Sequence, residues 1–211
     1  MDNDKAFDDF LGISTGEEVL NGLQVTTGAY TEDDNPYQAT YYNDLVQIFD
    51  RISMEPEDKL VDFGCGLGRV LFYVNSRHYC KVAGIESNKE IYDRLLQNAA
   101  GYQSKFLEQE DRMFFHYLRA DEYEITPEDN FFYFFNPFSG ETFGRVIDNI
   151  IASARKNPRD MQLIVYYPTY EILREIKRVK LFIQKGIIKL SHYEEDPDEK
   201  AYIFYLSRYV L

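Results

Sequence analysis

One stretch of the sequence, residues 60–70, constrains the fold more than any other. It begins with the apolar residues of a strand that is buried on both faces, and it contains the pattern D-x-G-x-G-x-G from Asp62 onward. The three glycines allow a tight turn that a ligand can approach closely, because no Cβ stands in the way. The apolar residues from Val70 onward suit the buried side of a helix. The stretch therefore predicts a strand, a turn and a helix, with a ligand at the N–H groups of the helix start.

The glycine spacing distinguishes this turn from two common nucleotide-binding motifs. The dinucleotide motif G-x-G-x-x-G is absent because residue 69 is Arg, and the phosphate loop is absent because no Gly-Lys-Ser/Thr follows. The pattern resembles instead the first motif of the class I S-adenosylmethionine-dependent methyltransferases. That resemblance implies that the cofactor S-adenosyl-L-methionine is bound by a set of residues here: Asp62, Gly64, Cys65, Gly66 and Gly68. A structural turn with chance glycines is the alternative.

The order of elements along the chain fits one α/β domain. Five segments have the composition of strands and are separated by helical patterns, at residues 60–63, 81–86, 113–118, 131–135 and 161–167. Two later strands, at 180–190 and 201–206, flank an acidic loop and suit an antiparallel hairpin. The resemblance implies a three-layer Rossmann-like sandwich with a mostly parallel seven-strand sheet that ends in this hairpin.

Acidic residues follow two of the predicted strands. Glu86 lies 22 residues beyond Gly64, where a βαβ unit brings the end of its second strand, and its carboxylate can accept hydrogen bonds from both ribose hydroxyls. Ser87 is its neighbour at the same strand end. NAD offers the same ribose contact, so Glu86 does not separate a methyltransferase from an NAD-binding oxidoreductase. The resemblance implies that Asp121, after the third strand, accepts a hydrogen bond from the adenine amine.

The all-aromatic segment at 131–135 predicts a central strand, and it ends in Asn136-Pro137-Phe138. Ligands of open parallel sheets bind beyond the carboxyl ends of the strands, so we expect this tripeptide beside the methyl group. It resembles the fourth methyltransferase motif, which makes Asn136, Pro137 and Phe138 the candidate catalytic residues, with Asn136 also near the cofactor. The single proline departs from the Pro-Pro pair of adenine-methylating members. An ordinary Asn-Pro turn is the alternative.

A segment rich in Tyr and Thr precedes the first strand and leads into a helix that ends near Ser53. In the class I family, some bacterial members and the seven-strand histone-lysine methyltransferases have such a segment. The resemblance implies that Tyr37, Thr40 and Tyr42 reach the methionine end of the cofactor. We also expect Tyr30, Tyr37 or Tyr42 to line the approach of the acceptor, with an aromatic face that favours a developing cation. Packing and helix capping are the alternative roles of these side chains.

The net charge of −13 is distributed unevenly. Residues 1–34 contain nine acidic residues and one lysine, a second acidic group lies at 194–200, and the rest is close to neutral. We therefore expect an acidic N-terminal arm at 1–34, either mobile or a lid, and a methyltransferase domain at 35–211. The chain lacks the basic stripe that a phosphate backbone requires, so nucleic acid is not the expected partner.

Other features indicate the setting of the protein. No apolar run approaches the ~20 residues of a membrane span, and the acidic start is unlike a signal peptide, so no membrane partner is expected. Cys65 and Cys80 form neither a disulfide framework nor a metal-binding spacing. We expect a reduced, cytoplasmic protein without a metal.

The sequence thus predicts an enzyme that moves a methyl group from S-adenosyl-L-methionine to a nitrogen or oxygen of a small molecule or protein side chain. Such a transfer mainly requires a nucleophile held in line with the methyl group. None of the histidines, His78, His116 and His192, has a predictable partner, so no general base is assigned. A non-catalytic S-adenosylmethionine-binding module and an NAD-binding oxidoreductase are the alternatives. The acceptor and the oligomeric state are left open.

Overall fold

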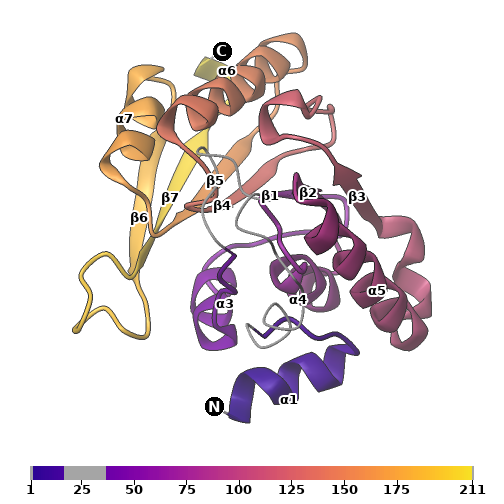
Figure 1. The fold of residues 1–211 in the computed structure, drawn as a ribbon. Coiled ribbons are helices and arrows are strands. Elements are labelled where there is room, and N and C mark those ends of the chain that lie inside the picture. Colours follow the sequence, from indigo (N-terminus) through magenta and orange to yellow (C-terminus); the bar gives the residue numbers. More distant parts are fainter. Residues whose placement is uncertain (1, 17–36, 211) are drawn as a thin grey trace.

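A seven-stranded sheet forms the centre of the protein (Figure 1). The computed structural model describes residues 2–16 and 37–210. The strand order is β3-β2-β1-β4-β5-β7-β6; β1 to β5 are parallel, and β7 runs antiparallel to both β5 and β6. The strands are β1 Lys59–Phe63, β2 Lys81–Glu86, β3 Met113–Tyr117, β4 Phe131–Phe135, β5 Met161–Tyr166, β6 Ile183–Lys189 and β7 Lys200–Leu206. The predicted Rossmann-like sandwich with an antiparallel C-terminal hairpin is confirmed.

Helices cover both faces of the sheet. Figure 1 shows α6 and α7 on one side and α1, α3, α4 and α5 on the other, and each side has its own apolar core. The helices are α1 Asp2–Leu11, α3 Tyr42–Phe49, α4 Arg69–His78, α5 Lys89–Lys105, α6 Gly140–Lys156 and α7 Tyr170–Arg178, with short 3-10 helices at Leu107–Arg112, Ala120–Glu122 and Arg208–Val210. In the part of the chain that the structure describes, no helix is long and apolar enough to cross a membrane.

The aromatic strand β4 contributes to both cores because alternate side chains of a strand point to opposite faces. The ring of Phe134 stacks on that of Phe63 at 5.1 Å, within the core under α6. The ring of Tyr133 points the other way and stacks near Phe49 of α3, at 6.2 Å. This alternation places the Tyr133 side chain on the face where the cleft described below opens.

The sequence pattern places the end of α5 at Gly101, and this prediction is wrong, because the helix continues to Lys105. Gly101 does not end the helix but lets the N-terminal segment pack closely against it. A Cβ at residue 101 would lie 2.2 Å from the carbonyl oxygen of Gly12, so only glycine lets the N-terminal segment cross α5 at this distance.

The first residues of the predicted acidic arm pack onto the domain. Helix α1 contacts α3, α4 and α5, and Leu11 and Ile13 are buried in the core on that side. The sequence shows no clear period here, so this helix was not predicted. Residues 17–34 of the arm, including Tyr30, lie outside the described residues, and the mobile arm or lid stays a prediction.

Candidate active site

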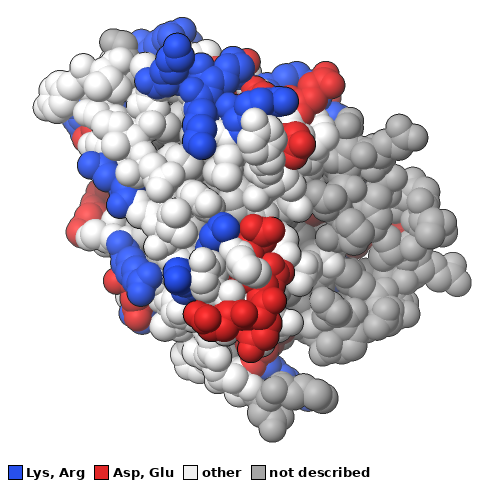
Figure 2. Space-filling model, turned by 90° about the vertical axis from the view of Figure 1, so that its left-hand side faces the viewer, with Lys and Arg blue, Asp and Glu red and all other residues white. Residues whose placement is uncertain are grey.

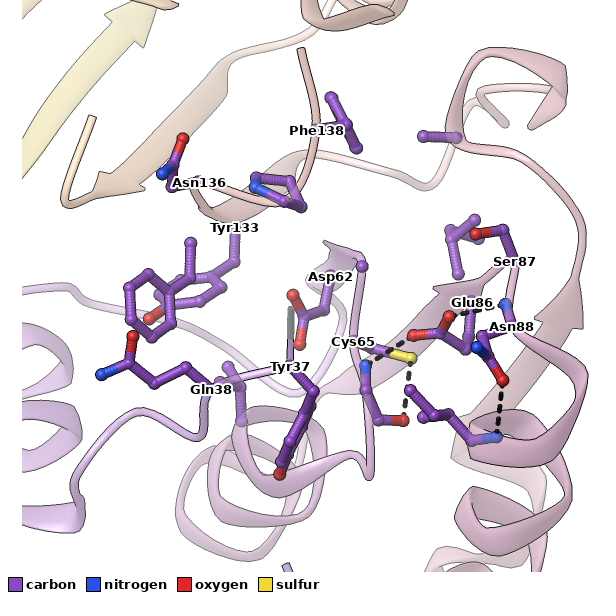
Figure 3. A pocket seen from close by; sticks show the side chains of 18 of the residues that line it. Tyr37, Gln38, Asp62, Cys65, Glu86, Ser87, Asn88, Tyr133, Asn136 and Phe138 are labelled. Carbon is purple, nitrogen blue, oxygen red and sulfur yellow. Dashed lines mark hydrogen bonds between the residues drawn. The ribbon is translucent and has the colours of Figure 1, made fainter. Parts of the chain in front are cut away.

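A cleft of about 500 Å³ lies beyond the carboxyl ends of the parallel strands (Figure 3). Most of the predicted site residues line it together, although they come from four separate parts of the chain. These residues are Tyr37, Thr40, Asp62, Gly64, Cys65, Gly66, Glu86, Ser87, Asn136, Pro137 and Phe138. The expectation that the glycine turn and Glu86 share one cleft therefore agrees with the structure.

The turn after β1 requires its glycines. Gly64, Gly66 and Gly68 have φ angles of 76°, 54° and 88°, in the left-handed region that other residues rarely adopt. A Cβ at Gly64 would lie 2.6 Å from the Cβ of Pro137, and one at Gly66 would lie 2.2 Å from the ring of Tyr37. The first two glycines thus let the turn pack against two other walls of the cleft.

Several N–H groups of this turn are already used within the protein. Those of Gly64 and Cys65 donate to the Ile85 carbonyl at 2.9 and 3.0 Å, and that of Gly68 donates to the Cys65 carbonyl at 2.9 Å. The N–H of Gly66 donates to the carboxylate of Glu86, the last residue of β2. A phosphate loop directs such groups at its ligand, so this turn is poorly suited to a pyrophosphate.

Glu86 joins the turn to the next loop. Its Oε2 accepts the Gly66 N–H at 3.0 Å, and its Oε1 accepts the Asn88 N–H at 2.8 Å. A carboxylate only accepts hydrogen bonds, and its two oxygens together offer about four lone-pair sites. Figure 3 shows the carboxylate at the cleft beside Ser87. This position suits the predicted contact with ribose hydroxyls.

Asp62 gives the cleft a second, more deeply buried acid. Its side chain is only 3% exposed, and among the described residues no group donates a hydrogen bond to its carboxylate. Burial raises the pKa of Asp62 well above its usual value, and the nearby charge of Glu86 raises it further. Two carboxyl groups in one cleft favour a ligand with positive charge and disfavour a pyrophosphate.

The residues that follow two adjacent strands have positive φ angles, a backbone conformation that costs energy for residues other than glycine. Asn136 after β4 has φ 38° and Tyr167 after β5 has φ 50°, and both line the cleft. Such conformations often occur at functional sites, where the surrounding structure holds them. Phe138 also lines the cleft, but its ring packs edge-on against Phe134 in the core, so it forms a wall.

Two predicted cofactor residues do not line the cleft. Gly68 caps α4, where a Cβ would lie 2.5 Å from Leu95, so helix packing accounts for this glycine. The Asp121 carboxylate accepts hydrogen bonds from Arg145 at 2.8 Å and Arg119 at 3.3 Å. Partial burial by itself would raise the pKa of Asp121, but these two arginines hold it below its usual value. Its contact with adenine stays a prediction.

Tyr42 also lies outside the cleft, since it is fully buried and its hydroxyl donates to Asp8 at 2.6 Å. This contact suits the alternative packing role of Tyr42. The described residues that line the cleft include no histidine. Within the described ranges, no three His, Cys, Asp or Glu side chains are grouped to hold a metal ion.

Sequence reasoning missed several side chains of the cleft. Tyr133 and Phe135 of β4 line it, as does Tyr167 at the end of β5. Asn136 was predicted because it follows the carboxyl end of a strand. The same rule predicts Tyr167, which follows β5. Arg69, the first residue of α4, also lines the cleft, and no local pattern in the sequence indicates its contacts.

Comparisons with known proteins agree with this geometry. The family described as "Histone methylation protein DOT1" matches residues 29–132, just under half of the chain. A histone-lysine N-methyltransferase specific for H3 lysine-79 from Dictyostelium discoideum is 36% identical over 55 residues. That match spans 26% of this chain but only 3% of the Dictyostelium protein.

Solved structures extend the similarity to the whole fold. A geranyl diphosphate C-methyltransferase from Streptomyces coelicolor A3(2) superposes with a TM-score of 0.56 at 10% identity, covering 99% of this chain and 98% of that one. An RNA methyltransferase from Salinibacter ruber gives a TM-score of 0.56 at 12% identity, covering 80% of this chain and 92% of that one. At these identities the likeness shows the fold alone.

The seven-strand sheet with its antiparallel C-terminal hairpin is thus the fold of the class I S-adenosylmethionine-dependent methyltransferases, and the fold that the resemblance implies is confirmed. Within that class, the sequence is similar to the DOT1 histone methylation proteins over the segment that contains the glycine turn, Glu86 and Asp121.

Proposed function

We propose that this protein transfers a methyl group from S-adenosyl-L-methionine to an amine nitrogen, with a protein lysine side chain as the first acceptor to test. The observation that carries the proposal is the meeting of Asp62, Glu86 and Asn136 around one cleft beside the glycine turn. The match to DOT1 proteins and the lysine specificity of the Dictyostelium relative support an amine acceptor.

The residues of the cleft fit this cofactor. Glu86 would hold the ribose hydroxyls, because its carboxylate is acceptor-only and lies at the end of β2. The cofactor has a positively charged sulfonium and ammonium, and Asp62 supplies a buried negative charge without a donor among the described residues. When bound, the cofactor supplies a methyl group on a good leaving group.

The protein then has to hold the acceptor. The side-chain carbonyl of Asn136 or the backbone carbonyl of Pro137 can accept an N–H of a neutral amine and so direct its lone pair at the methyl group. The faces of Tyr133 and Phe135 exclude water and stabilise the positive charge that develops on nitrogen. No protein base is assigned for the proton that the amine loses, and none of the described residues that line the cleft is a histidine.

An acidic loop beside the cleft supports a cationic acceptor. Tyr167 lines the cleft, and its hydroxyl donates to Asp196 in the loop between β6 and β7. The same loop exposes Glu194, Glu195 and Asp198. Figure 2, which views the molecule from this side, shows a group of acidic side chains on this face. A segment rich in lysine or arginine would be attracted to it.

The two alternatives have less support. An NAD-binding oxidoreductase would place a pyrophosphate near Asp62 and Glu86, at a turn whose N–H groups are largely used within the protein. A binding module without catalysis would not require strained backbone at Asn136 and Tyr167, which line the same cleft as Asp62 and Glu86.

Calorimetry and a transfer assay test the proposal. We expect binding of S-adenosylhomocysteine and S-adenosylmethionine but not NAD, and transfer of labelled methyl groups to a lysine-rich protein. The variant Asn136→Ala is the matched control, since it should bind the cofactor and transfer little. Binding of NAD alone would refute the proposal, and binding of the sulfur ligands without transfer to any amine would favour the binding module.

A further inference from the structure

A buried arginine links the N-terminal segment to the cleft. Arg69 follows the glycine turn, lines the cleft and is only 5% exposed. Its Nε donates to Thr15 Oγ1 at 2.6 Å, and its Nη1 donates to Asp4 Oδ2 at 2.7 Å and to the Thr40 carbonyl at 3.1 Å. The guanidinium also lies over the ring of Tyr42, 4.8 Å from its centroid. One side chain thus connects residues 4 and 15 with residues 40 and 42.

A second acid completes this group. Asp8, also buried, accepts hydrogen bonds from the N–H of Thr15 at 2.6 Å, from the Thr15 hydroxyl at 2.8 Å and from the Tyr42 hydroxyl at 2.6 Å. Its Oδ1 lies 3.8 Å from Arg69 Nε. The carboxylates of Asp4 and Asp8 therefore compensate the charge of the Arg69 guanidinium. The hydroxyl of the buried Thr15 accepts a hydrogen bond from Arg69 and donates one to Asp8. Networks of this kind, when satisfied, fix a single geometry.

The Arg69 cluster, by which we mean Asp4, Asp8, Thr15 and Arg69, holds one wall of the cleft. That wall is the segment 37–40. The Tyr37 hydroxyl donates to the Thr15 carbonyl at 2.9 Å, while its ring lies against the glycine turn at Gly66. At the other end of the wall, the Thr40 hydroxyl is hydrogen-bonded to Tyr133 of β4 at 2.9 Å. The wall therefore depends on contacts from residues near the N-terminus.

The position of this wall indicates which part of the ligand it meets. If Glu86 at the end of β2 holds the ribose, the ligand extends toward β3 on one side and toward β1 and β4 on the other. The wall contacts the turn after β1 and Tyr133 of β4, so it lies on the second side. Figure 3 shows Tyr37 and Gln38 across the cleft from Glu86 and Ser87.

We infer that residues 2–16 belong to the cofactor-binding site, in which the Arg69 cluster positions the wall 37–40 around the amino-acid end of the cofactor. Arg69 is then a positioning residue, since two of its nitrogens are held by Asp4, Thr15 and Thr40. This inference rests on the proposed function, because it assumes the ribose contact of Glu86.

Two ligands that differ only in this end of the molecule provide the test. S-adenosylhomocysteine has the amino-acid group, whereas methylthioadenosine retains only adenosine and a methylthio group. Replacing Arg69 itself would remove the cation that compensates the buried Asp8 and the partly buried Asp4 and so endanger folding. Thr15→Val, which keeps the side-chain shape, is therefore the first variant. We expect its affinity for S-adenosylhomocysteine to fall about tenfold or more, and that for methylthioadenosine to change less than about threefold. Tyr37→Phe, which removes the bond to the Thr15 carbonyl, should give a smaller loss with the same selectivity.

The matched control lies at the opposite ends of the strands. Lys59 forms a buried ion pair with Asp129 at 2.9 Å, so Lys59→Met disturbs a buried charge away from the cleft. It should lower the thermal midpoint of the ligand-free protein without changing either affinity. Equal losses for both ligands in Thr15→Val, or unchanged affinity for both, would overturn the inference. Failure of the unmodified protein to bind either ligand would instead refute the proposed function.

Discussion

Replacing Asp62 by Asn should make the ligand-free protein more stable. Asp62 is a buried carboxyl group without a donor among the described residues, and Glu86 adds repulsion, so its ionised form is costly in the native state. Asn has the same shape without the charge. Because the substitution removes the charge of a buried carboxylate that Glu86 repels, we expect it to add about 1–3 kcal/mol to the free energy of unfolding. For a chain of this size, the thermal midpoint should rise by roughly 2–10 °C at neutral pH.

The pH dependence of this gain follows from the direction of the pKa shift. Because the pKa of Asp62 is raised in the native state, that state binds the proton more tightly than the unfolded chain does. Stability therefore falls as pH rises from the usual Asp value of 3.8 toward the raised pKa, and this loss is complete above it. Asp62→Asn lacks this loss. The difference in thermal midpoint between the two proteins should vanish near pH 3.8 and grow as pH increases.

The same substitution should weaken cofactor binding. Loss of a charged hydrogen bond to the ammonium group costs about 1.5–3 kcal/mol, or roughly 10–150-fold in the affinity for S-adenosylhomocysteine. Below the raised pKa, binding should also release a proton from Asp62. Calorimetry in two buffers of different ionisation enthalpy detects this release, which should be absent in Asp62→Asn. If Asp62→Asn instead lowers the thermal midpoint and leaves the affinity unchanged, Asp62 stabilises the fold and does not contact the cofactor.

Three further substitutions separate the parts of the cleft. Glu86→Gln should weaken both S-adenosylhomocysteine and methylthioadenosine by about 1–3 kcal/mol in calorimetry, and unchanged affinities would exclude Glu86 from the ribose contact. Asn136→Ala should reduce methyl transfer while cofactor affinity stays within about twofold, because the proposal places its side-chain carbonyl beside the acceptor amine; abolished binding would contradict this placement. Gly66→Ala should lower the thermal midpoint and cofactor affinity together, since its φ is 54° and the added Cβ meets the Tyr37 ring. A Gly66→Ala protein that melts and binds as the unmodified one does would mean that Tyr37 moves freely.

The parts of the fold and site that the sequence predicts are those encoded by neighbouring residues. Strand β1, the turn after it and Glu86 at the end of β2 lie within residues 59–86, and each is marked by glycines, apolar runs or an acid at a strand end. Asn136 is predictable for the same reason, because it follows an aromatic strand. These features need only the rule that parallel strands bring their carboxyl ends to one edge.

The parts that the sequence does not predict depend on distant partners. Gly101 has the position of a helix stop, but the Gly12 carbonyl that crosses it explains the glycine. Asp121 has the position of an adenine contact, and its carboxylate is held by Arg145 of α6. Arg69 follows the turn without any distinctive local pattern. Its partner Asp4 is 65 residues away in the sequence, and such pairings are set only when the chain folds.

The two halves of the cleft should therefore respond differently to substitution. The half formed by the glycine turn and Glu86 is built from adjacent elements, so a change there alters the contacts of adenosine directly. The half formed by residues 37–40 is held by Thr15 and Arg69, so changes far from the ligand in sequence can alter the amino-acid end alone. A cycle of Glu86→Gln and Thr15→Val tests this division. If the halves are independent, the losses in S-adenosylhomocysteine affinity should add within about 0.5 kcal/mol, and a larger coupling energy would show that the Arg69 cluster also positions Glu86 through Gly66.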